Sequence, residues 1–439
     1  MSLPCFPLTL ALAACSRPSD AAPRTELFET IQTWRGSELD HLGIGVSPLG
    51  DVDGDGYPDF ILGKMTGAYS FFFGPGAARV ISGKDGRLLY EVCGTIGGGC
   101  RCGDAYGDTM APLGDLDGDG VPDFAVGAWR YGGHLGLAVV YSGRDGRPLA
   151  TIYGDGRVAR GEGPVPSEEC DDFHPQGFGG WITALGDIDG DAVPDFAIGG
   201  EYPNGSSVLV SGARFTLRGD YPGIVLGMTG DYDGDGRPDI ACVASGGTEM
   251  ILCAVADHRR LEAFSLGRSG FGEKVGGSPV ASVGDVDGDG FLDLYIVETE
   301  IGAVPSGALP VVPLAARCVS GRTGEILFVV DLEPGECPQR ACVSPIGDVD
   351  GDGLTDIFVQ ASFSPARGAR GEEWIVSGGK GTVLARATVA SPIEGRRVAR
   401  IGNPPGDHST RLLVSDYESQ AGAKCGGAVH LVRLTLPPK

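Results

Sequence analysis

The sequence predicts an all-β protein, namely a seven-bladed β-propeller with four short strands in each blade. An acidic segment of eleven residues occurs six times, and short apolar runs separated by Gly- and Ser-rich turns surround every copy. The same flanking pattern occurs a seventh time without the acidic segment. No useful length of the chain shows helical periodicity, so each unit is expected to form four strands. Four-stranded units repeated around an axis are the blades of a propeller, which has about four to eight of them.

The composition agrees with many short strands joined by tight turns. The 439 residues include 75 Gly and 30 Pro, and 42% of the chain is hydrophobic. This Gly and Pro content approaches that of low-complexity sequences, but the apolar content is sufficient for a packed core. We therefore expect an ordered chain, with turns marked by Gly, Asp and Ser.

The repeat is defined by the acidic segment GDVDGDGYPDF at 50–60. Its copies begin at 50, 114, 186, 230, 284 and 347, so the five intervals average about 59 residues. An apolar run precedes each copy, as in HLGIGVSPLG (41–50), and another follows it, as in FILG. A third run ends in a Ser-Gly turn, as in ARVISGKDGR (78–87), and a fourth follows, as in LLYEVCG. Each unit thus predicts four consecutive strands.

The seventh unit predicts how the ring closes. Residues 398–419 keep the flanking runs, but Asn403-Pro404-Pro405-Gly406-Asp407 replaces the acidic segment, and a third run, GGAVHLVRL, follows. The unit lacks a fourth run, whereas residues 26–36 resemble the fourth runs of other units. We expect this N-terminal strand to complete the last blade, which leaves fewer free sheet edges. The propeller then spans residues 26–439.

The N-terminus suggests export. In residues 1–15, an apolar run ends in Leu12-Ala13-Ala14-Cys15, which resembles a bacterial lipoprotein signal whose Cys15 accepts a lipid. A positively charged beginning is missing, and Pro4 and Pro7 interrupt the apolar run, so a frayed apolar terminus is the alternative. Residues 16–25 read as a linker. No other run approaches the roughly 18 apolar residues of a membrane-spanning helix.

The acidic segment predicts a metal site, because four carboxylates within nine residues repel one another unless a cation balances them. The spacing D-x-D-x-D-G resembles the EF-hand calcium loop, but position 12 is apolar in all six copies and no helix follows. The fourth Asp is at position 9, directly before a strand, so the loop connects two strands of a hairpin. The expected ligands are the four Asp side chains and the backbone carbonyl of position 7. By copy, these residues are Asp51, Asp53, Asp55, Tyr57 and Asp59; Asp115, Asp117, Asp119, Val121 and Asp123; Asp187, Asp189, Asp191, Val193 and Asp195; Asp231, Asp233, Asp235, Arg237 and Asp239; Asp285, Asp287, Asp289, Phe291 and Asp293; Asp348, Asp350, Asp352, Leu354 and Asp356.

The donor chemistry favours calcium, with up to six ions per chain. Carboxylate and carbonyl oxygens on a pliable loop suit Ca²⁺, whereas Mg²⁺ requires stricter octahedral geometry and keeps several waters. Position 6 is Gly in five copies, which allows a sharp turn with positive φ. Ala192 stands there in the third copy and is expected to strain that site. The alternative, Asp-Gly turns without an ion, is hard to reconcile with six intact copies.

The charge excludes one class of partner. The net charge is −24, and the six segments hold 24 of the 58 acidic residues. Six divalent ions would halve this charge, and no Lys or Arg cluster offsets it. Nucleic-acid binding is therefore not expected.

Twelve cysteines are many for a reducing compartment, so we expect some disulfides. Cys242 and Cys253 lie on two apolar runs joined by SGGT, which would bring them face to face across a hairpin. Cys337 and Cys342 would close a short local loop. Free buried thiols are the alternative in both cases.

The six loops, the preceding YGDTMAPLG and FGGWITALG strands, and the FAVGA and FAIGG runs resemble the FG-GAP repeats of integrin α propellers and their bacterial relatives. The resemblance covers roughly residues 26–436. It implies a seven-bladed propeller with Ca²⁺ in hairpin loops on one face, and a cell-surface or secreted protein that binds other molecules. The chain has more such loops than the integrin pattern, and in this respect it is similar to the bacterial relatives.

Function is expected to be binding rather than catalysis. The six His are scattered and no nucleophile motif is present, although paired carboxylates for glycosidic chemistry could lie among the acidic residues. We expect a non-enzymatic module in the cell envelope or outside the cell that binds an extracellular protein or glycan. A carbohydrate-active enzyme or lectin on the same fold is the alternative. The insert between Gly154 and Gly177 is the candidate binding loop, while Arg218-Gly219-Asp220, which spells an integrin-recognition tripeptide, is interpreted as coincidence.

Overall fold

The computed structural model describes most of the chain after the N-terminal segment. The described residues are 27–65, 67–68, 71–72, 75–95, 103–165, 177–200, 206–244, 249–266, 280–297, 314–333, 340–363, 370–389, 397–416 and 426–436. The predicted signal (1–15) and linker (16–25), with Cys15, lie outside them.

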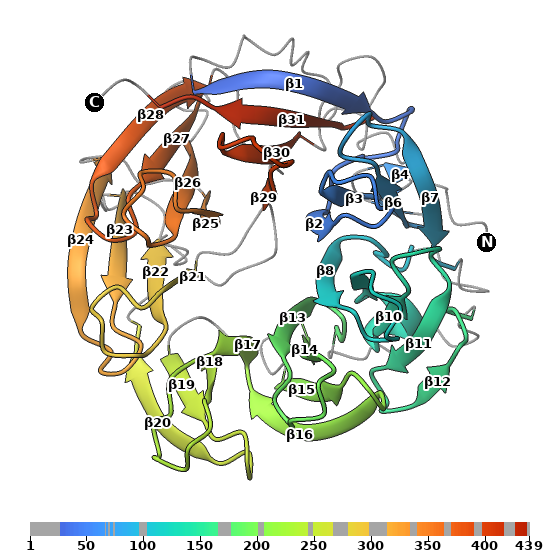
Figure 1. The fold of residues 1–439 in the computed structure, drawn as a ribbon, viewed down its shortest axis with the longest axis horizontal. Helices are drawn as coiled ribbons and strands as arrows, with labels where there is room; N and C mark the ends of the chain where they lie inside the picture. Colours follow the sequence, from blue (N-terminus) through green and yellow to red (C-terminus); the bar gives the residue numbers. More distant parts are fainter. Residues whose placement is uncertain are drawn as a thin grey trace, which may run out of the picture.

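Seven antiparallel sheets stand around a central axis, so the predicted seven-bladed propeller is confirmed (Figure 1). Successive strands of a blade run from the centre of the ring to its rim. Blade 1 holds β2 (Val46–Gly50), β3 (Asp59–Lys64), β6 (Ala77–Ile81) and β7 (Leu88–Cys93); blade 2 holds β8 (Thr109–Gly114), β9 (Asp123–Ala128), β10 (Leu137–Tyr141), β11 (Pro148–Tyr153) and β12 (Val158–Arg160); blade 3 holds β13 (Trp181–Gly186), β14 (Asp195–Gly199), β15 (Ser206–Ser211) and β16 (Thr216–Pro222); blade 4 holds β17 (Ile224–Met228), β18 (Ile240–Val243), β19 (Glu249–Cys253) and β20 (Arg260–Ser265); blade 5 holds β21 (Val280–Gly284), β22 (Asp293–Val297), β23 (Leu314–Val319) and β24 (Ile326–Glu333); blade 6 holds β25 (Arg340–Gly347), β26 (Asp356–Phe363), β27 (Arg370–Val376) and β28 (Val383–Val389); blade 7 holds β29 (Val398–Ile401), β30 (Arg411–Asp416), β31 (Ala428–Leu434) and β1 (Phe28–Arg35).

The ring closes as the sequence predicts, because β1 forms the outer strand of blade 7 (Figure 1). It pairs antiparallel with β31 from Phe28 opposite Leu434 to Arg35 opposite Ala428. The first and last described strands of the chain are therefore hydrogen-bonded neighbours, which covers the edge that β31 would otherwise expose.

The core consists of the apolar faces of neighbouring blades. The second and third strands are buried on both faces, as in β9 and β10, so they read as continuous apolar runs rather than alternating ones. The residue after the last Asp of each loop enters this core: Phe60, Phe124 and Phe196 have no exposed surface, and Phe358, one residue further along β26, is 1% exposed. The strand after each loop is thus packed between blades from its first two or three residues onward.

The structure adds three elements to the predicted pattern. The insert after Gly154 turns back and forms β12, a fifth strand on the outer edge of blade 2, while its residues 166–176 lie outside the described residues. A two-stranded ribbon, β4 (Gly67–Ala68) and β5 (Phe71–Phe72), extends blade 1. The short helix α1 (Tyr131–His134) contains two glycines with positive φ, so it is a compact turn. Among the described residues, no helix is long and apolar enough to cross a membrane.

The expected Cys242–Cys253 disulfide is not formed. Both thiols are free and buried, and they are joined by a side-chain hydrogen bond. The register explains this result, because Cys242 lies opposite Ile251 and Cys253 lies opposite Ile240, so the two cysteines are diagonal rather than facing. The Cys342 thiol donates to Oε1 of Gln360 at 3.5 Å, and its expected partner Cys337 lies outside the described residues.

Trp34 on β1 tests whether the closing strand stabilises the ring. Its ring packs edge-on against Phe60 of blade 1 at 5.1 Å, and its indole N–H donates to the Gly86 carbonyl at 3.0 Å. Replacing Trp34 with Ala is expected to lower the free energy of unfolding by about 2–4 kcal/mol. W34F, which loses the hydrogen bond but keeps a ring, should cost about 1 kcal/mol in the same denaturant titration. Equal stability of W34A and the wild type would contradict this role.

Candidate metal centres

The acidic segments connect the first and second strands of blades 1–6, as predicted. We number them loop 1 to loop 6 in chain order, and the connection between β29 and β30 is loop 7. A Cβ placed on Gly50, before loop 1, would contact Pro122 at the end of loop 2 at 3.2 Å, and one on Gly402 would contact Pro58 of loop 1 at 2.9 Å. Neighbouring loops therefore lie side by side on one face of the ring. The six loops span Asp51–Asp59, Asp115–Asp123, Asp187–Asp195, Asp231–Asp239, Asp285–Asp293 and Asp348–Asp356.

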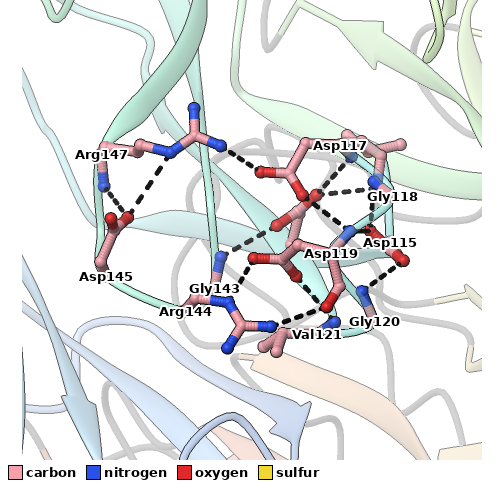
Figure 2. Close-up of polar contacts among 12 residues, drawn as sticks. Asp115, Asp117, Gly118, Asp119, Gly120, Val121, Gly143, Arg144, Asp145 and Arg147 are labelled. Carbon is pink, nitrogen blue, oxygen red and sulfur yellow. Dashed lines mark hydrogen bonds and ion pairs between the residues drawn. The ribbon is translucent and has the colours of Figure 1, made fainter.

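Loop 2 shows how the first three carboxylates shape the loop (Figure 2). The Oδ1 atom of Asp115 accepts the N–H groups of Gly118 at 2.8 Å and Asp119 at 3.1 Å. Its Oδ2 atom accepts the N–H of Gly120 at 2.8 Å, and Oδ1 of Asp119 accepts that of Val121 at 2.9 Å. The backbone is thus wrapped around the carboxylates, and the same hydrogen bonds recur in the other five loops.

The fourth carboxylate is buried beneath the loop. Asp123 has no exposed surface, and its Oδ2 accepts the N–H groups of Leu116 at 2.7 Å and Asp117 at 3.3 Å. Its Oδ1 accepts the N–H of Gly143, in the turn after the third strand, at 2.9 Å. The equivalent Asp residues are 0–2% exposed in all six loops. In loops 1, 2, 3, 5 and 6 the position 9 carboxylate therefore joins the loop to the turn after the third strand.

The folded loops bring the predicted ligands together. Side-chain oxygens of positions 1, 3 and 9 lie within 4.8 Å of one another in loops 1 to 4, and those of positions 1, 3 and 5 do so in loop 5. Three carboxylates this close form a negatively charged cluster of oxygen donors. These oxygens fit a hard divalent cation, and the backbone carbonyl of position 7 is part of the same loop.

Burial raises the pKa of the position 9 carboxylates. It raises the pKa of Asp123 to about 6, although the N–H groups of Gly143 and Leu116 act in the opposite direction. The pKa values of Asp59, Asp195, Asp239, Asp293 and Asp356 are also raised, with burial as the largest cause. A buried carboxylate beside like charges is the kind of group that a bound cation stabilises in its ionised form.

The backbone at position 6 is left-handed in all six loops. Gly56 has φ of +85° and nothing lies within 4 Å of a Cβ placed there. Ala192 has the same conformation, with φ of +68°, so loop 3 keeps the shared path and its Ala is held in a region that disfavours residues other than Gly. The predicted backbone strain is confirmed.

Basic side chains next to the carboxylates are a feature that the sequence analysis missed. In blades 1, 2, 4 and 6 they come from the turn between the third and fourth strands, which we call the outer hairpin, and in blade 3 Arg218 comes from the fourth strand, β16. In blade 2, Arg147 contacts Oδ2 of Asp117 at 2.6 Å and Arg144 contacts Oδ2 of Asp119 at 2.6 Å (Figure 2). The repeated turn SGKDGR or SGRDGR contains these residues. The sequence therefore shows the basic residues, but it does not show that they contact the loop carboxylates.

Loop 7 contains an ion pair in place of the acidic cluster. Arg411 begins β30, where loops 1–3, 5 and 6 have their buried Asp, and it contacts Oδ2 of Asp407 at 2.6 Å. Asp407 Oδ1 accepts the N–H of Ser409 at 2.9 Å, as position 5 does in the other loops. Hydrogen bonds from Ser409 and the charge of Arg411 lower the pKa of Asp407 to about 2. The oxygen of Asn403, at position 1, has no hydrogen-bond partner.

Sequence comparisons relate the chain to integrins. Residues 231–296 match the family model of the FG-GAP-like repeat. Integrin alpha-PS2 of Drosophila melanogaster is 25% identical over 262 residues, which are 52% of this chain and 17% of that protein. Integrin alpha pat-2 of Caenorhabditis elegans is 32% identical over 132 residues, which are 29% of this chain and 10% of that protein. The matches thus span a small part of these relatives.

A comparison of structures supports the fold. A chain in the crystal structure of BBS1N in complex with ARL6DN matches with a TM-score of 0.53 and 11% identity, over 93% of this chain and 98% of that chain. The class that the fold and these comparisons define is a seven-bladed β-propeller, in which residues 231–296 match the FG-GAP-like repeat and part of the chain is similar to part of integrin α subunits. Its blades carry Asp clusters suited to metal ions.

Arg218 of the tripeptide Arg218-Gly219-Asp220 contacts Oδ2 of Asp189 in loop 3 at 2.6 Å. All three residues belong to β16, where Asp220 pairs with Val208. The tripeptide is thus part of a blade, in agreement with its interpretation as coincidence.

The raised pKa of Asp123 predicts a pH dependence for the metal-free protein. Its pKa is about 6 in the folded state, above the ordinary value of 3.8, so the folded state holds the proton more tightly. This contribution to stability is complete below about pH 4 and is lost as the pH rises through about 6. Because metal requires the ionised form, the extra stability conferred by a divalent cation should grow over the same range. Denaturant titrations from pH 4 to about 7, with cation and with chelator, measure this difference, and a constant difference would contradict it.

Proposed function

We propose that the protein is a calcium-binding propeller that works outside the cytoplasm as a non-enzymatic binding module for a protein or glycan. The observation that carries this proposal is the recurrence of one oxygen-lined cluster in successive blades of one face. In each loop, the four Asp side chains and the carbonyl of position 7 would hold the ion. Calcium supplies the positive charge that allows the buried and exposed carboxylates to remain ionised together.

Calcium fits this role for two reasons. The donors are carboxylate and carbonyl oxygens, without the His nitrogen or Cys sulfur that zinc and other transition metals prefer. The loops are glycine-rich and pliable, which suits the six to eight ligands of calcium better than the strict octahedron of magnesium. The role is architectural, because the buried carboxylate also holds the third strand of the blade.

A binding role is supported by homology to integrin α subunits and by the propeller itself, a rigid scaffold that presents loops. We place the protein in the cell envelope or outside the cell, where calcium is abundant, with Cys15 as the proposed lipid anchor. An extracellular protein is the first partner to test and a glycan the second. The predicted binding insert ends in residues outside the described part of the chain.

Calcium removal is the first test of this proposal. Each ion that binds only the folded state adds about 2.7 kcal/mol when its concentration is 100 times the dissociation constant. We therefore expect a chelator to lower the melting temperature strongly, and calcium to restore it at lower concentration than magnesium does. Equal melting curves in calcium and in chelator would contradict structural metal sites.

Partner capture tests the binding role. The full chain, immobilised in calcium, is exposed to cell-surface proteins and to a panel of polysaccharides, with a chelator arm as the control. We expect retention of a protein or glycan that is lost when calcium is removed. Cleavage of a polysaccharide by the chain alone would instead support the enzymatic alternative.

A further inference from the structure

The last residue of the outer hairpin occupies an equivalent place in five blades. In each, its carbonyl accepts the N–H of the first residue of the turn at 2.9–3.0 Å. At this place the chain has an acidic residue in blade 5, a neutral one in blade 6 and a basic one in the other three. In chain order the residues are Arg87, Arg147, Arg259, Glu325 and Thr382.

Where this residue is Arg, its guanidinium contacts the position 3 carboxylate of the same blade. The contacts are 2.6–2.7 Å long in loops 1, 2 and 4. Loops 3 and 6 have a different cation on the same carboxylate, since Arg218 contacts Asp189 at 2.6 Å and Lys380 contacts Asp350 at 3.4 Å. Loop 2 has a second one, Arg144 on Asp119. Five of the six acidic loops thus have an internal counter-ion.

Loop 5 differs from all of these. Within the described part of the chain, none of its four carboxylates forms an ion pair with a basic side chain. The nearby Arg322 instead lies over the ring of Phe291, with its guanidinium carbon 5.1 Å from the centroid. Glu325 stands where blades 1, 2 and 4 have Arg. The clustered carboxylates here are those of positions 1, 3 and 5, and the charge of Arg322 reaches Asp289 without an ion pair between these two residues.

A guanidinium beside a carboxylate has two opposite effects on a metal loop. In the metal-free protein it neutralises part of the cluster and thereby stabilises the loop. When a divalent cation binds, the same charge repels it across a few ångströms. Loop 7 is the limiting case, because Arg411 supplies the positive charge on its own. The net effect of each outer-hairpin cation is therefore to weaken metal binding at its loop.

We propose that the outer-hairpin charge sets the calcium affinity of each loop, and that loop 5, with Glu325, is the tightest site on the ring. This inference rests on the proposed calcium sites and ranks them by their affinity for calcium. Loop 2, with Arg144 and Arg147, is then among the weakest. The loops would fill in an order set by their counter-ions rather than as equal sites.

Charge substitutions test the proposal in calcium titrations of the full chain by calorimetry, after removal of bound metal. Glu325→Arg is expected to weaken the tightest binding step by about five- to tenfold, because the charge at this position changes from −1 to +1 near a divalent ion. Arg147→Gln is expected to tighten binding at loop 2 by about three- to fivefold. Both effects should shrink in about 1 M salt, where the screening length is about 3 Å.

Two further variants make the result specific. Asp287→Asn removes a loop 5 carboxylate and should abolish the tightest step. Asp331→Arg makes an acidic-to-basic change at an exposed position of β24, the strand that follows Glu325, six residues and thus about 20 Å further along the chain. This control should leave the tightest step unchanged.

The outcomes separate the two proposals. If the wild type takes up no calcium, the proposed function fails and this inference fails with it. If the wild type binds calcium but Arg147→Gln weakens binding, the Arg is a positioning residue and this inference alone is overturned. The same holds if Asp287→Asn leaves the tightest step intact, or if Glu325→Arg affects it no more than Asp331→Arg does.

Discussion

The architecture depends on one buried carboxylate in each acidic loop. Through Asp59, the N–H of Val52 and the N–H of Gly83 are bound to the same side chain, which joins the first, second and third strands of blade 1. This contact requires Gly in the Ser-Gly turn, because a Cβ on Gly83 would overlap the carbonyl oxygen of Pro58. The same overlap would occur at the Gly residues of blades 2, 3, 5 and 6. The repeated Asp and the repeated Gly are therefore two halves of one interaction.

The ring is a consequence of repeating this interaction. Blades 1, 2, 3, 5 and 6 each have a buried carboxylate that bonds to the turn after the third strand. Adjacent blades share an apolar interface that begins one or two residues later, as at Phe60. Blade 7 lacks the buried Asp and is held by β1, by the pair of Asp407 and Arg411, and by Arg433, which contacts Glu29 of β1 at 2.8 Å. Blade 7 thus has ion pairs within the protein where the other blades have an acidic cluster.

The sequence predicted what is local and repeated. Loop positions, strand order and the closing strand all follow from short patterns that recur with a period of about 59 residues. It did not predict what depends on register between strands, such as the diagonal arrangement of Cys242 and Cys253. The contacts of Arg147 and Arg218 with loop carboxylates were missed for the same reason, because they join residues about 30 positions apart. The fifth strand, β12, lies in an insert without a counterpart in other blades.

The loop face therefore contains three solutions to one electrostatic problem. Loops 1 to 4 and 6 combine an acidic cluster with an internal cation, loop 5 has the cluster without an ion-paired cation among the described residues, and loop 7 has the cation with a single carboxylate. Identical loops would bind metal within one narrow concentration range, so all six loops would lose their ions together. Unequal counter-ions spread that loss over a wider range. With the proposed graded calcium sites, some loops would keep their ion, and loop 7 its ion pair, while the calcium concentration falls.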